Sequence, residues 1–162
     1  MTANSTSPVA VIGAGIMGSA IASRLLETGH DVYSFDLDPD KVAALVAKGA
    51  KAADSVAQAV SRTQFCILSL NHANIVRAAV FGPAGVAIAA TDKKLLIDMS
   101  SIDPADTAEM AARLQAETGM AWVDCPLSGG APGALEGRLT IMAGGTVEDF
   151  ERARPVMRHL AA

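Results

Sequence analysis

Val9-Ala10-Val11-Ile12-Gly13-Ala14-Gly15-Ile16-Met17-Gly18 sets the architecture of this chain. Its first four residues are apolar and predict a buried strand, and the apolar spacing that resumes after Gly18 predicts a helix. Between them stands G-x-G-x-x-G, in the strand–turn–helix context in which this pattern binds a dinucleotide. Gly13 permits a tight turn, Gly15 lets a pyrophosphate approach the backbone, and Gly18 lets the helix pack against the strand. We therefore predict a dinucleotide site.

A carboxylate follows at the spacing that such a site requires. Asp36 directly follows the next expected strand, residues 31–35, at the spacing of ~20 residues typical of a group that binds the adenosine ribose. It would accept hydrogen bonds from both ribose hydroxyls and repel a 2′-phosphate. Leu37 stands where an arginine would neutralise that phosphate. NAD is therefore expected to be preferred over NADP. A simple turn beginning at Asp36 is the competing interpretation.

The composition restricts the class of protein. Of 162 residues, 51% are hydrophobic and 19% charged, which suits a sheet covered by helices on both faces. The net charge of −4, with dispersed Lys and Arg, does not favour nucleic-acid binding. No apolar run reaches the ~18 residues of a membrane span. Cys66 and Cys125 are too far apart for a metal cluster, and we expect buried thiols in a cytoplasmic protein without a metal site.

Apolar runs alternate with helical patterns along the rest of the chain. Further strands are expected at residues 50–53, 65–70, 95–99, 121–124 and 139–143, with a glycine-rich loop at 128–137. Asp38-Pro39 and Asp103-Pro104 predict helix starts, with the aspartate as cap and the proline at the first position. The alternation predicts an α/β, Rossmann-type, doubly wound and mostly parallel sheet. Residues 9–162 would form this NAD-binding domain, and residues 1–8 a flexible tail.

Polar residues directly follow the expected strand ends, where ligands of such sheets bind. The Ser128-Gly129-Gly130 segment can offer a hydroxyl and consecutive backbone N–H groups to an anion, although an ordinary turn is the competing interpretation. The hydroxyls of Ser100 and Ser101 would line the cofactor cleft; alternatively, Ser101 and Asp103 would merely cap the following helix. His72 opens a helix and is expected to be a helix cap or a solvated residue rather than a group that moves protons.

Four ordered motifs together resemble the β-hydroxyacid dehydrogenase family. They are Gly13-Ala14-Gly15-Ile16-Met17-Gly18, Asp98-Met99-Ser100-Ser101, Asp124-Cys125-Pro126-Leu127-Ser128-Gly129-Gly130 and the run from Gly133 to Gly145. Three shorter segments look most similar to the L-threonate and tartronate semialdehyde enzymes of this family. They are Phe35-Asp36-Leu37-Asp38-Pro39, Leu70-Asn71 and Val80-Phe81-Gly82.

The resemblance implies hydride transfer between a nicotinamide cofactor and a β-hydroxy acid of the L-threonate, 3-hydroxyisobutyrate or tartronate semialdehyde type. It also implies a homo-oligomer for the full-length protein. The cofactor residues it implies are Gly13, Ala14, Gly15, Ile16, Met17, Gly18, Asp36, Leu37, Leu70, Asn71, Ser100 and Ser101. The substrate residues it implies are Ser128, Gly129, Gly130 and Ser100.

The resemblance places the general acid/base, a lysine, in a second, all-helical domain. We expect that domain to lie beyond residue 162, so no catalytic residue is assigned within this chain. The 162 residues alone are then expected to bind NAD without turnover. Two alternatives remain: a free-standing NAD-binding module, and an imine reductase-like domain, which shares the same type of N-terminal domain.

Overall fold

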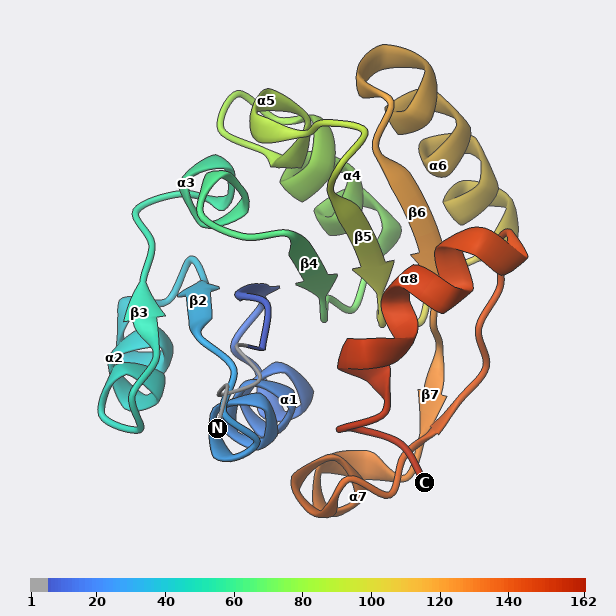
Figure 1. The fold of residues 1–162 in the computed structure, drawn as a ribbon. Coiled ribbons are helices and arrows are strands. Elements are labelled where there is room, and N and C mark those ends of the chain that lie inside the picture. Colours follow the sequence, from blue (N-terminus) through green and yellow to red (C-terminus); the bar gives the residue numbers. More distant parts are fainter. Residues whose placement is uncertain (1–5) are drawn as a thin grey trace.

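A six-stranded parallel sheet forms the centre of the protein in the computed structural model, which describes residues 6–162 (Figure 1). The strand order is β3-β2-β1-β4-β5-β6. This is the order of a dinucleotide-binding Rossmann sheet, and it confirms the expected fold class. The strands are β1 (Val9–Ile12), β2 (Val32–Phe35), β3 (Lys51–Ala52), β4 (Phe65–Leu68), β5 (Leu95–Asp98) and β6 (Ala121–Asp124).

The register aligns the carboxyl ends of the central strands. Ile12 pairs with Phe35 on β2 and with Leu68 on β4, and Leu68 pairs with Asp98 on β5, which in turn pairs with Asp124 on β6. The strand order reverses between β1 and β4, and ligands of open α/β sheets bind in the crevice at such a reversal. The glycine turn after β1 therefore faces the segment after β4.

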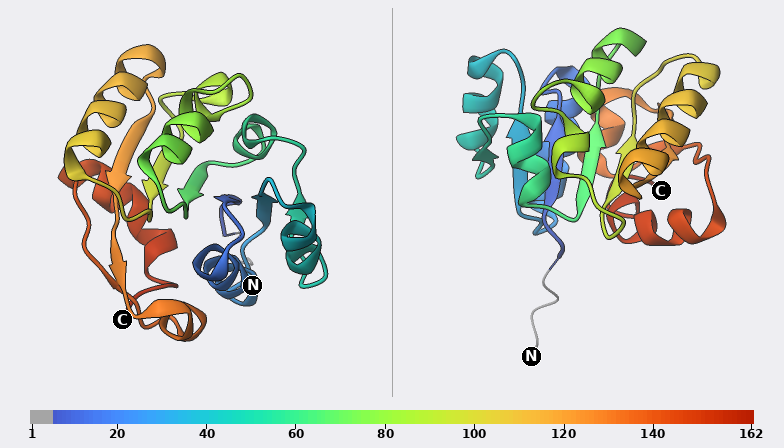
Figure 2. Two further views of the ribbon diagram at one scale, coloured as in Figure 1. Left: turned by 180° about the vertical axis from the view of Figure 1, so that it is seen from behind. Right: turned by 90° about the horizontal axis from the view of Figure 1, so that it is seen from above.

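Helices cover both faces of the sheet, because the alternating side chains of each buried strand are apolar on both sides. One apolar cluster joins the sheet to α1, α2, α7 and α8, and the other joins it to α3, α4, α5 and α6. Figure 2 shows the second face from behind, with α4 and α6 in front of the sheet. The helices are α1 (Ile16–Glu27), α2 (Pro39–Val46), α3 (Val56–Ser61), α4 (Ala73–Phe81), α5 (Val86–Ala89), α6 (Pro104–Thr118), α7 (Gly130–Glu136) and α8 (Val147–Met157).

Local signals account for the helix ends. The Asp38 carboxylate accepts the Asp40 N–H at 3.1 Å and caps α2, and the Asp103 carboxylate accepts the Ala105 N–H at 2.8 Å and caps α6. Gly119 ends α6 in the left-handed conformation, with φ +77°. The two aspartate–proline starts were expected from sequence. The parallel strands also lie within two residues of their expected bounds.

The segment after β6 differs from expectation. Residues 130–136, expected as part of a glycine-rich loop, form helix α7, and the strand expected at 139–143 is only β8 (Thr140–Ile141). β8 pairs antiparallel with β7 (Leu127–Ser128), apart from the main sheet. Glycine disfavours helix by about 1 kcal/mol relative to alanine, so local propensity predicts a loop. Burial of Ala134 in the cluster that also holds α1 overrides this preference.

The expected tail, residues 1–8, is described only in part, because residues 1–5 lie outside the described residues. From residue 6 onward the chain makes hydrogen bonds: the Thr6 hydroxyl donates to the Gly29 carbonyl, and the Gln64 N–H donates to the Pro8 carbonyl at 3.3 Å. Within residues 6–162, no helix combines the length and the apolar composition needed to cross a membrane.

Candidate functional site

Two glycines of the β1–α1 turn are required by packing. Gly13 has φ +95°, and a Cβ built on it would lie 2.3 Å from the Ser69 carbonyl oxygen, just beyond β4. A Cβ on Gly18 would lie 1.8 Å from the Gly13 carbonyl oxygen. No real Cβ approaches backbone so closely. These two glycines therefore let the turn lie against β4 and let α1 lie against the turn.

Packing does not require a glycine at position 15. Gly15 is the N-cap of α1 with φ −68°, which any residue can adopt, and a Cβ built on it has no heavy atom within 4 Å. The backbone at the start of a twelve-residue helix is thus bare toward open space. The free N–H groups of such a helix start attract an anion, and only glycine lets the anion approach the chain itself.

The Asp36 carboxylate is anchored beside this turn. Its Oδ2 accepts the Ala14 N–H at 2.6 Å, and its Oδ1 accepts the Asp38 N–H at 2.8 Å. Each carboxylate oxygen has a further lone pair, so both hydrogen bonds leave capacity for ribose hydroxyls. The structure thus places Asp36 at the glycine turn, as the sequence spacing predicts. Two apolar side chains nearby in sequence are exposed, Ile16 by 83% and Leu37 by 89%.

Hydrogen bonds connect the segments that follow β4 and β5. The Asp98 Oδ1 accepts the Ser100 N–H at 2.9 Å, and the Ser100 hydroxyl oxygen accepts the Leu70 N–H at 3.1 Å. Ser100 is only 3% exposed, whereas Asn71 and Ser101 are exposed. Ser100 therefore holds two segments together at the carboxyl edge, and Ser101 presents its hydroxyl to solvent. Direct contact of either serine with a ligand stays a prediction.

Asp98 belongs to one of the motifs that carry the family resemblance, but the sequence assigned it no role in the site. Its side chain is completely buried, and its Oδ2 has no hydrogen-bond partner among the described residues. Burial raises the pKa of this carboxyl from 3.8 to about 6, the hydrogen bonds from Ser100 lower it, and the charge of Asp124 raises it further. The sequence signal that could have identified Asp98 is a charged residue at the end of an otherwise apolar strand.

The segment expected to hold a substrate carboxylate lies after β6. Ser128 is exposed in β7, and Gly129 and Gly130 follow with φ +127° and +64°. Successive glycines in this region of φ can direct neighbouring N–H groups toward one anion. Helix α7, which begins at Gly130, packs against α1, so this segment lies on the same face of the sheet as the glycine turn. Among the described residues, no hydrogen bond joins Ser128 to Ser100 or Ser101.

Three of the lysines lie away from this edge or at its adenosine side. Lys51 bonds Asp31 before β2, and Lys94 donates to carbonyls that precede β4, both at the amino ends of the strands. Lys41, in the first turns of α2, lies 3.9 Å from Asp38. His72 caps α4 by accepting the Asn74 N–H at 3.3 Å, as expected. Within residues 6–162, no cluster of three potential metal ligands occurs.

The two cysteines are buried and unpaired, as expected. Burial raises the pKa of the Cys125 thiol to about 12 and raises that of Cys66 as well, so both thiols are protonated at neutral pH. Neither is a nucleophile in this environment, because the thiolate is the reactive form.

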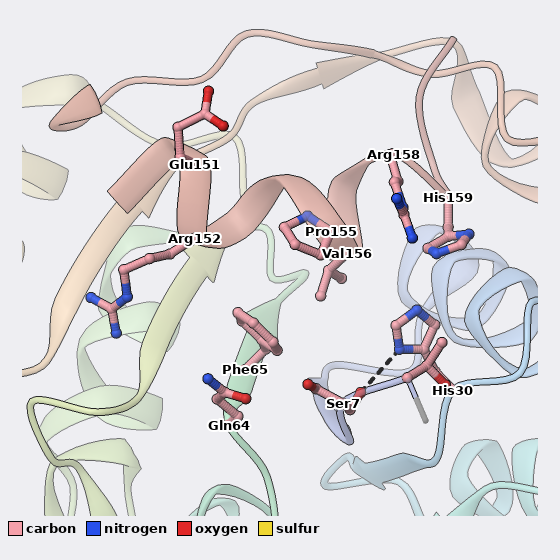
Figure 3. Close-up of a pocket in the computed structure, with 11 residues that line it drawn as sticks. Ser7, His30, Gln64, Phe65, Glu151, Arg152, Pro155, Val156, Arg158 and His159 are labelled. Carbon is pink, nitrogen blue, oxygen red and sulfur yellow. Dashed lines mark hydrogen bonds between the residues drawn. The ribbon is translucent and has the colours of Figure 1, made fainter. Parts of the chain in front are cut away.

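A cavity of about 620 Å³ lies at the amino ends of β1 and β4, opposite the glycine turn (Figure 3). Its lining includes His30 and His159, whose rings meet edge to face with centroids 5.1 Å apart. Burial and the neighbouring positive groups lower the pKa of His159. None of the residues predicted to bind cofactor or substrate lines this cavity. It is therefore separate from the candidate site.

The strand order, the open turn at Gly15 and the anchored Asp36 define a dinucleotide-binding domain of the Rossmann type. Residues 8–162 match the family described as the NAD binding domain of 6-phosphogluconate dehydrogenase, and the chain belongs to this family. The family match confirms the expected relationship to NAD-dependent dehydrogenases and the expected binding of a nicotinamide cofactor.

Known proteins of several activities are similar to the chain. It is 41% identical over 149 residues to 2-(hydroxymethyl)glutarate dehydrogenase of Eubacterium barkeri, and 40% identical over 152 residues to 3-hydroxyisobutyrate dehydrogenase of Pseudomonas aeruginosa. These matches cover 92% and 94% of this chain and 49% and 51% of those proteins. The chain therefore spans about half the length of the curated relatives it matches.

Solved structures agree with the sequence matches. Mycobacterium tuberculosis 3-hydroxyisobutyrate dehydrogenase with L-serine superposes with a TM-score of 0.89 at 33% identity, over 96% of this chain and 52% of that chain. Psf3 in complex with NADP+ and 2-OPP superposes with a TM-score of 0.90 at 27% identity, over 95% of this chain and 54% of that chain. An imine reductase from Myxococcus stipitatus, 23% identical with a TM-score of 0.87, shares the fold.

Proposed function

We propose that this chain is the cofactor-binding half of a β-hydroxyacid dehydrogenase, an oxidoreductase that interconverts a β-hydroxy acid and its oxo acid with NAD. The observation that carries the proposal is the bare backbone at Gly15 beside the anchored Asp36. The relatives of similar sequence support the reaction class. The proposal keeps L-threonate, 3-hydroxyisobutyrate and tartronate semialdehyde as candidate substrate types, and a homo-oligomer for the longer protein.

The residues at the carboxyl edge fit an extended dinucleotide. The N-terminus of α1 would hold the pyrophosphate, and Asp36 would hold the adenosine ribose. A dinucleotide in this position would cover the exposed Ile16 and Leu37. The nicotinamide half would extend toward the segments after β4 and β5, where Leu70, Asn71 and Ser101 lie. When bound, the cofactor supplies the hydride acceptor or donor.

The substrate would lie beside the Ser128-Gly129-Gly130 segment. The serine hydroxyl and the glycine N–H groups would hold its carboxylate and so fix its reactive carbon relative to the nicotinamide. The reaction also needs a group that exchanges the hydroxyl proton within hydrogen-bond reach. The proposal assigns this role to a lysine of the longer protein, outside the residues that the structure describes.

The test of this proposal compares two lengths of chain. Residues 1–162 are expected to bind NADH, measured by fluorescence titration, without producing NADH from NAD+ and any of the three substrate types. General acid/base catalysis contributes about 10²–10⁴-fold, so a chain without that group should turn over at most at this reduced rate. The longer protein with its helical domain should show full turnover, and Ser128→Ala there should weaken substrate more than cofactor.

Three outcomes would contradict the proposal. Robust NADH production by residues 1–162 alone would place the catalytic group within this chain. Absence of NADH binding would show that the chain has no cofactor site. If the longer protein turned over cyclic imines but not hydroxy acids, this result would favour the alternative that the chain is part of an imine reductase.

Asp36 is expected to determine which cofactor is preferred. We expect the chain to bind NAD+ at least ~10-fold more tightly than NADP+, about 1.4 kcal/mol, because the carboxylate would face the 2′-phosphate. Asp36→Ser should reduce or reverse this ratio. Calorimetric titration of both cofactors with both proteins measures it.

Asp38→Ser is the matched control, since it makes the same chemical change two residues away. Asp38 caps α2, and serine can keep that cap, so its variant should retain the wild-type preference. Equal affinities of the wild-type chain for NAD+ and NADP+ would contradict the assignment of Asp36.

A further inference from the structure

The buried carboxylate of Asp98 is the feature that neither packing nor the proposed chemistry explains. It lies at the end of β5 without solvent exposure, and only its Oδ1 has a hydrogen-bond partner in the described part of the chain. Burying an ionisable group with an unpartnered oxygen costs stability. An apolar residue or an asparagine would cost less at this position. A residue buried at such a cost is a candidate for a role in the site.

The hydrogen bonds of Asp98 lead directly to the candidate cleft. Its carboxylate binds the Ser100 N–H, the Ser100 hydroxyl binds the Leu70 N–H, and its backbone carbonyl accepts the Cys125 N–H at 2.7 Å. The Asp98 side chain thus holds the segment after β5, and the Ser100 hydroxyl extends this contact to the segment after β4. The bond to Cys125 involves only backbone atoms and does not depend on the aspartate side chain. Because Asp98 is buried, it acts on the cleft only through these contacts.

We propose that Asp98 is a positioning residue, whose carboxylate holds the Ser100 and Leu70 segments in the conformation that receives the nicotinamide half of the cofactor. This inference rests on the proposed function, since it assumes that the nicotinamide lies at these two segments. It assigns no direct contact between Asp98 and any ligand.

The ionised carboxylate is the stronger partner for the Ser100 amide, because a hydrogen bond to a charged acceptor is roughly twice as strong as a neutral one. The titratable groups that face Asp98 are Asp124 on β6 and the thiols of Cys66 and Cys125. The thiols stay neutral below pH 8. Burial also raises the pKa of Asp124, so this second carboxyl needs its own control.

The first experiment measures amide hydrogen exchange in the ligand-free chain, so it does not depend on cofactor binding. Asp98→Ala should accelerate exchange of the Ser100 and Leu70 amides at least ~10-fold relative to wild type, while amides inside β4 and β5 keep their rates. Asp98→Asn should keep most of this protection, since its amide oxygen still accepts the Ser100 N–H. Asp124→Asn is the matched control and should leave both amides unchanged.

The second experiment measures the affinity for NAD+ by calorimetry at pH 8 and pH 5.5. Asp98→Ala should weaken binding by about 10-fold at pH 8, the effect of one hydrogen bond to a charged group. Wild type should bind several-fold more weakly at pH 5.5, where the carboxyl with pKa about 6 is mostly protonated. Asp98→Asn should be weaker than wild type at pH 8 and should lose this pH dependence.

A stability measurement separates positioning from a purely structural role. Because the folded-state pKa of about 6 lies above the ordinary 3.8, Asp98 favours folding below pH 4, and this contribution is lost as pH rises through 6. Asp98→Asn should therefore melt at a higher temperature than wild type at pH 8, with the difference shrinking toward pH 4. The expected signature is a variant that is more stable but binds NAD+ less tightly.

The outcomes distinguish this inference from the proposed function. If wild type binds NAD+ but the Asp98 variants bind it equally well and keep slow Ser100 and Leu70 exchange, the positioning role is wrong and the cofactor site stands. If wild type does not bind NAD+, both the proposed function and the positioning role are wrong, whatever the exchange rates show.

Discussion

Gly15→Val is expected to lose NADH binding by at least ~100-fold, about 2.8 kcal/mol, while the fold stays intact. The new side chain would occupy the space in which a pyrophosphate approaches the start of α1. Apart from the two chain neighbours, no heavy atom of the described residues lies within 4 Å of the added Cβ, and φ −68° is ordinary for valine. The only structural cost is a poorer N-cap, about 1 kcal/mol or less.

Fluorescence titration with NADH and a thermal melt of the same sample test this expectation. Gly15→Ala provides a graded comparison, because its single methyl group should weaken binding less than the valine side chain does. Wild-type affinity in Gly15→Val would show that the phosphates do not approach this turn. A large drop in melting temperature would contradict the open space at Gly15.

Gly18→Ala is expected to show the opposite behaviour, with the main effect on stability. Its Cβ would lie 1.8 Å from the Gly13 carbonyl oxygen, which belongs to backbone and cannot rotate away. Helix α1 would have to move off the turn and lose packing of Ile21 and Leu25, which are completely buried. We expect a loss of about 3 kcal/mol in the free energy of unfolding, or ~6–12 °C in melting temperature.

Urea unfolding followed by circular dichroism measures this loss. Gly15→Ala is the matched control, since it adds the same methyl group three residues earlier in the same turn. If Gly15→Ala and Gly18→Ala unfolded at the same urea concentration, the expected difference in packing between these two positions would be wrong. A Gly18→Ala protein of wild-type stability would mean that α1 can shift away from β1 at little cost.

The central sheet could be predicted because its strands lie inside the protein. A strand covered on both faces needs apolar residues throughout, so runs such as Phe65–Leu68 and Leu95–Asp98 are visible without any tertiary information. The helix starts at Asp38 and Asp103 were equally visible, because capping involves only neighbouring residues. Helix α7 was missed, because its glycine-rich sequence disfavours helix. The helix is stabilised by packing against α1, which lies more than 100 residues away in sequence.

Some features of the candidate site could likewise be predicted from the sequence, and others could not. The spacing of Asp36 from the glycines predicted its place at the turn, because one strand–helix–strand unit fixes that distance along the chain. Which side chains are buried and which are exposed at the site could not be predicted from spacing along the chain. Ser100 and Ser101 are adjacent and chemically identical, yet Ser100 is buried against Leu70 while Ser101 is exposed.

By itself, the sequence determined the fold class, the dinucleotide turn and the carboxylate beside it, since each depends on local spacing or on burial of continuous apolar segments. The family relationship came instead from the resemblance of four motifs to a known family. The sequence pattern assigned separate roles to Gly13, Gly15 and Gly18, but only the tertiary structure supplied the contacts behind them: Gly15 faces open space, whereas Gly13 and Gly18 are required by packing. The tertiary structure also revealed that the buried Asp98 carboxylate holds the Ser100 amide and that the Ser100 hydroxyl links this segment to Leu70 after β4. These distinctions depend on the distance between atoms that are remote in sequence, which only the folded chain specifies.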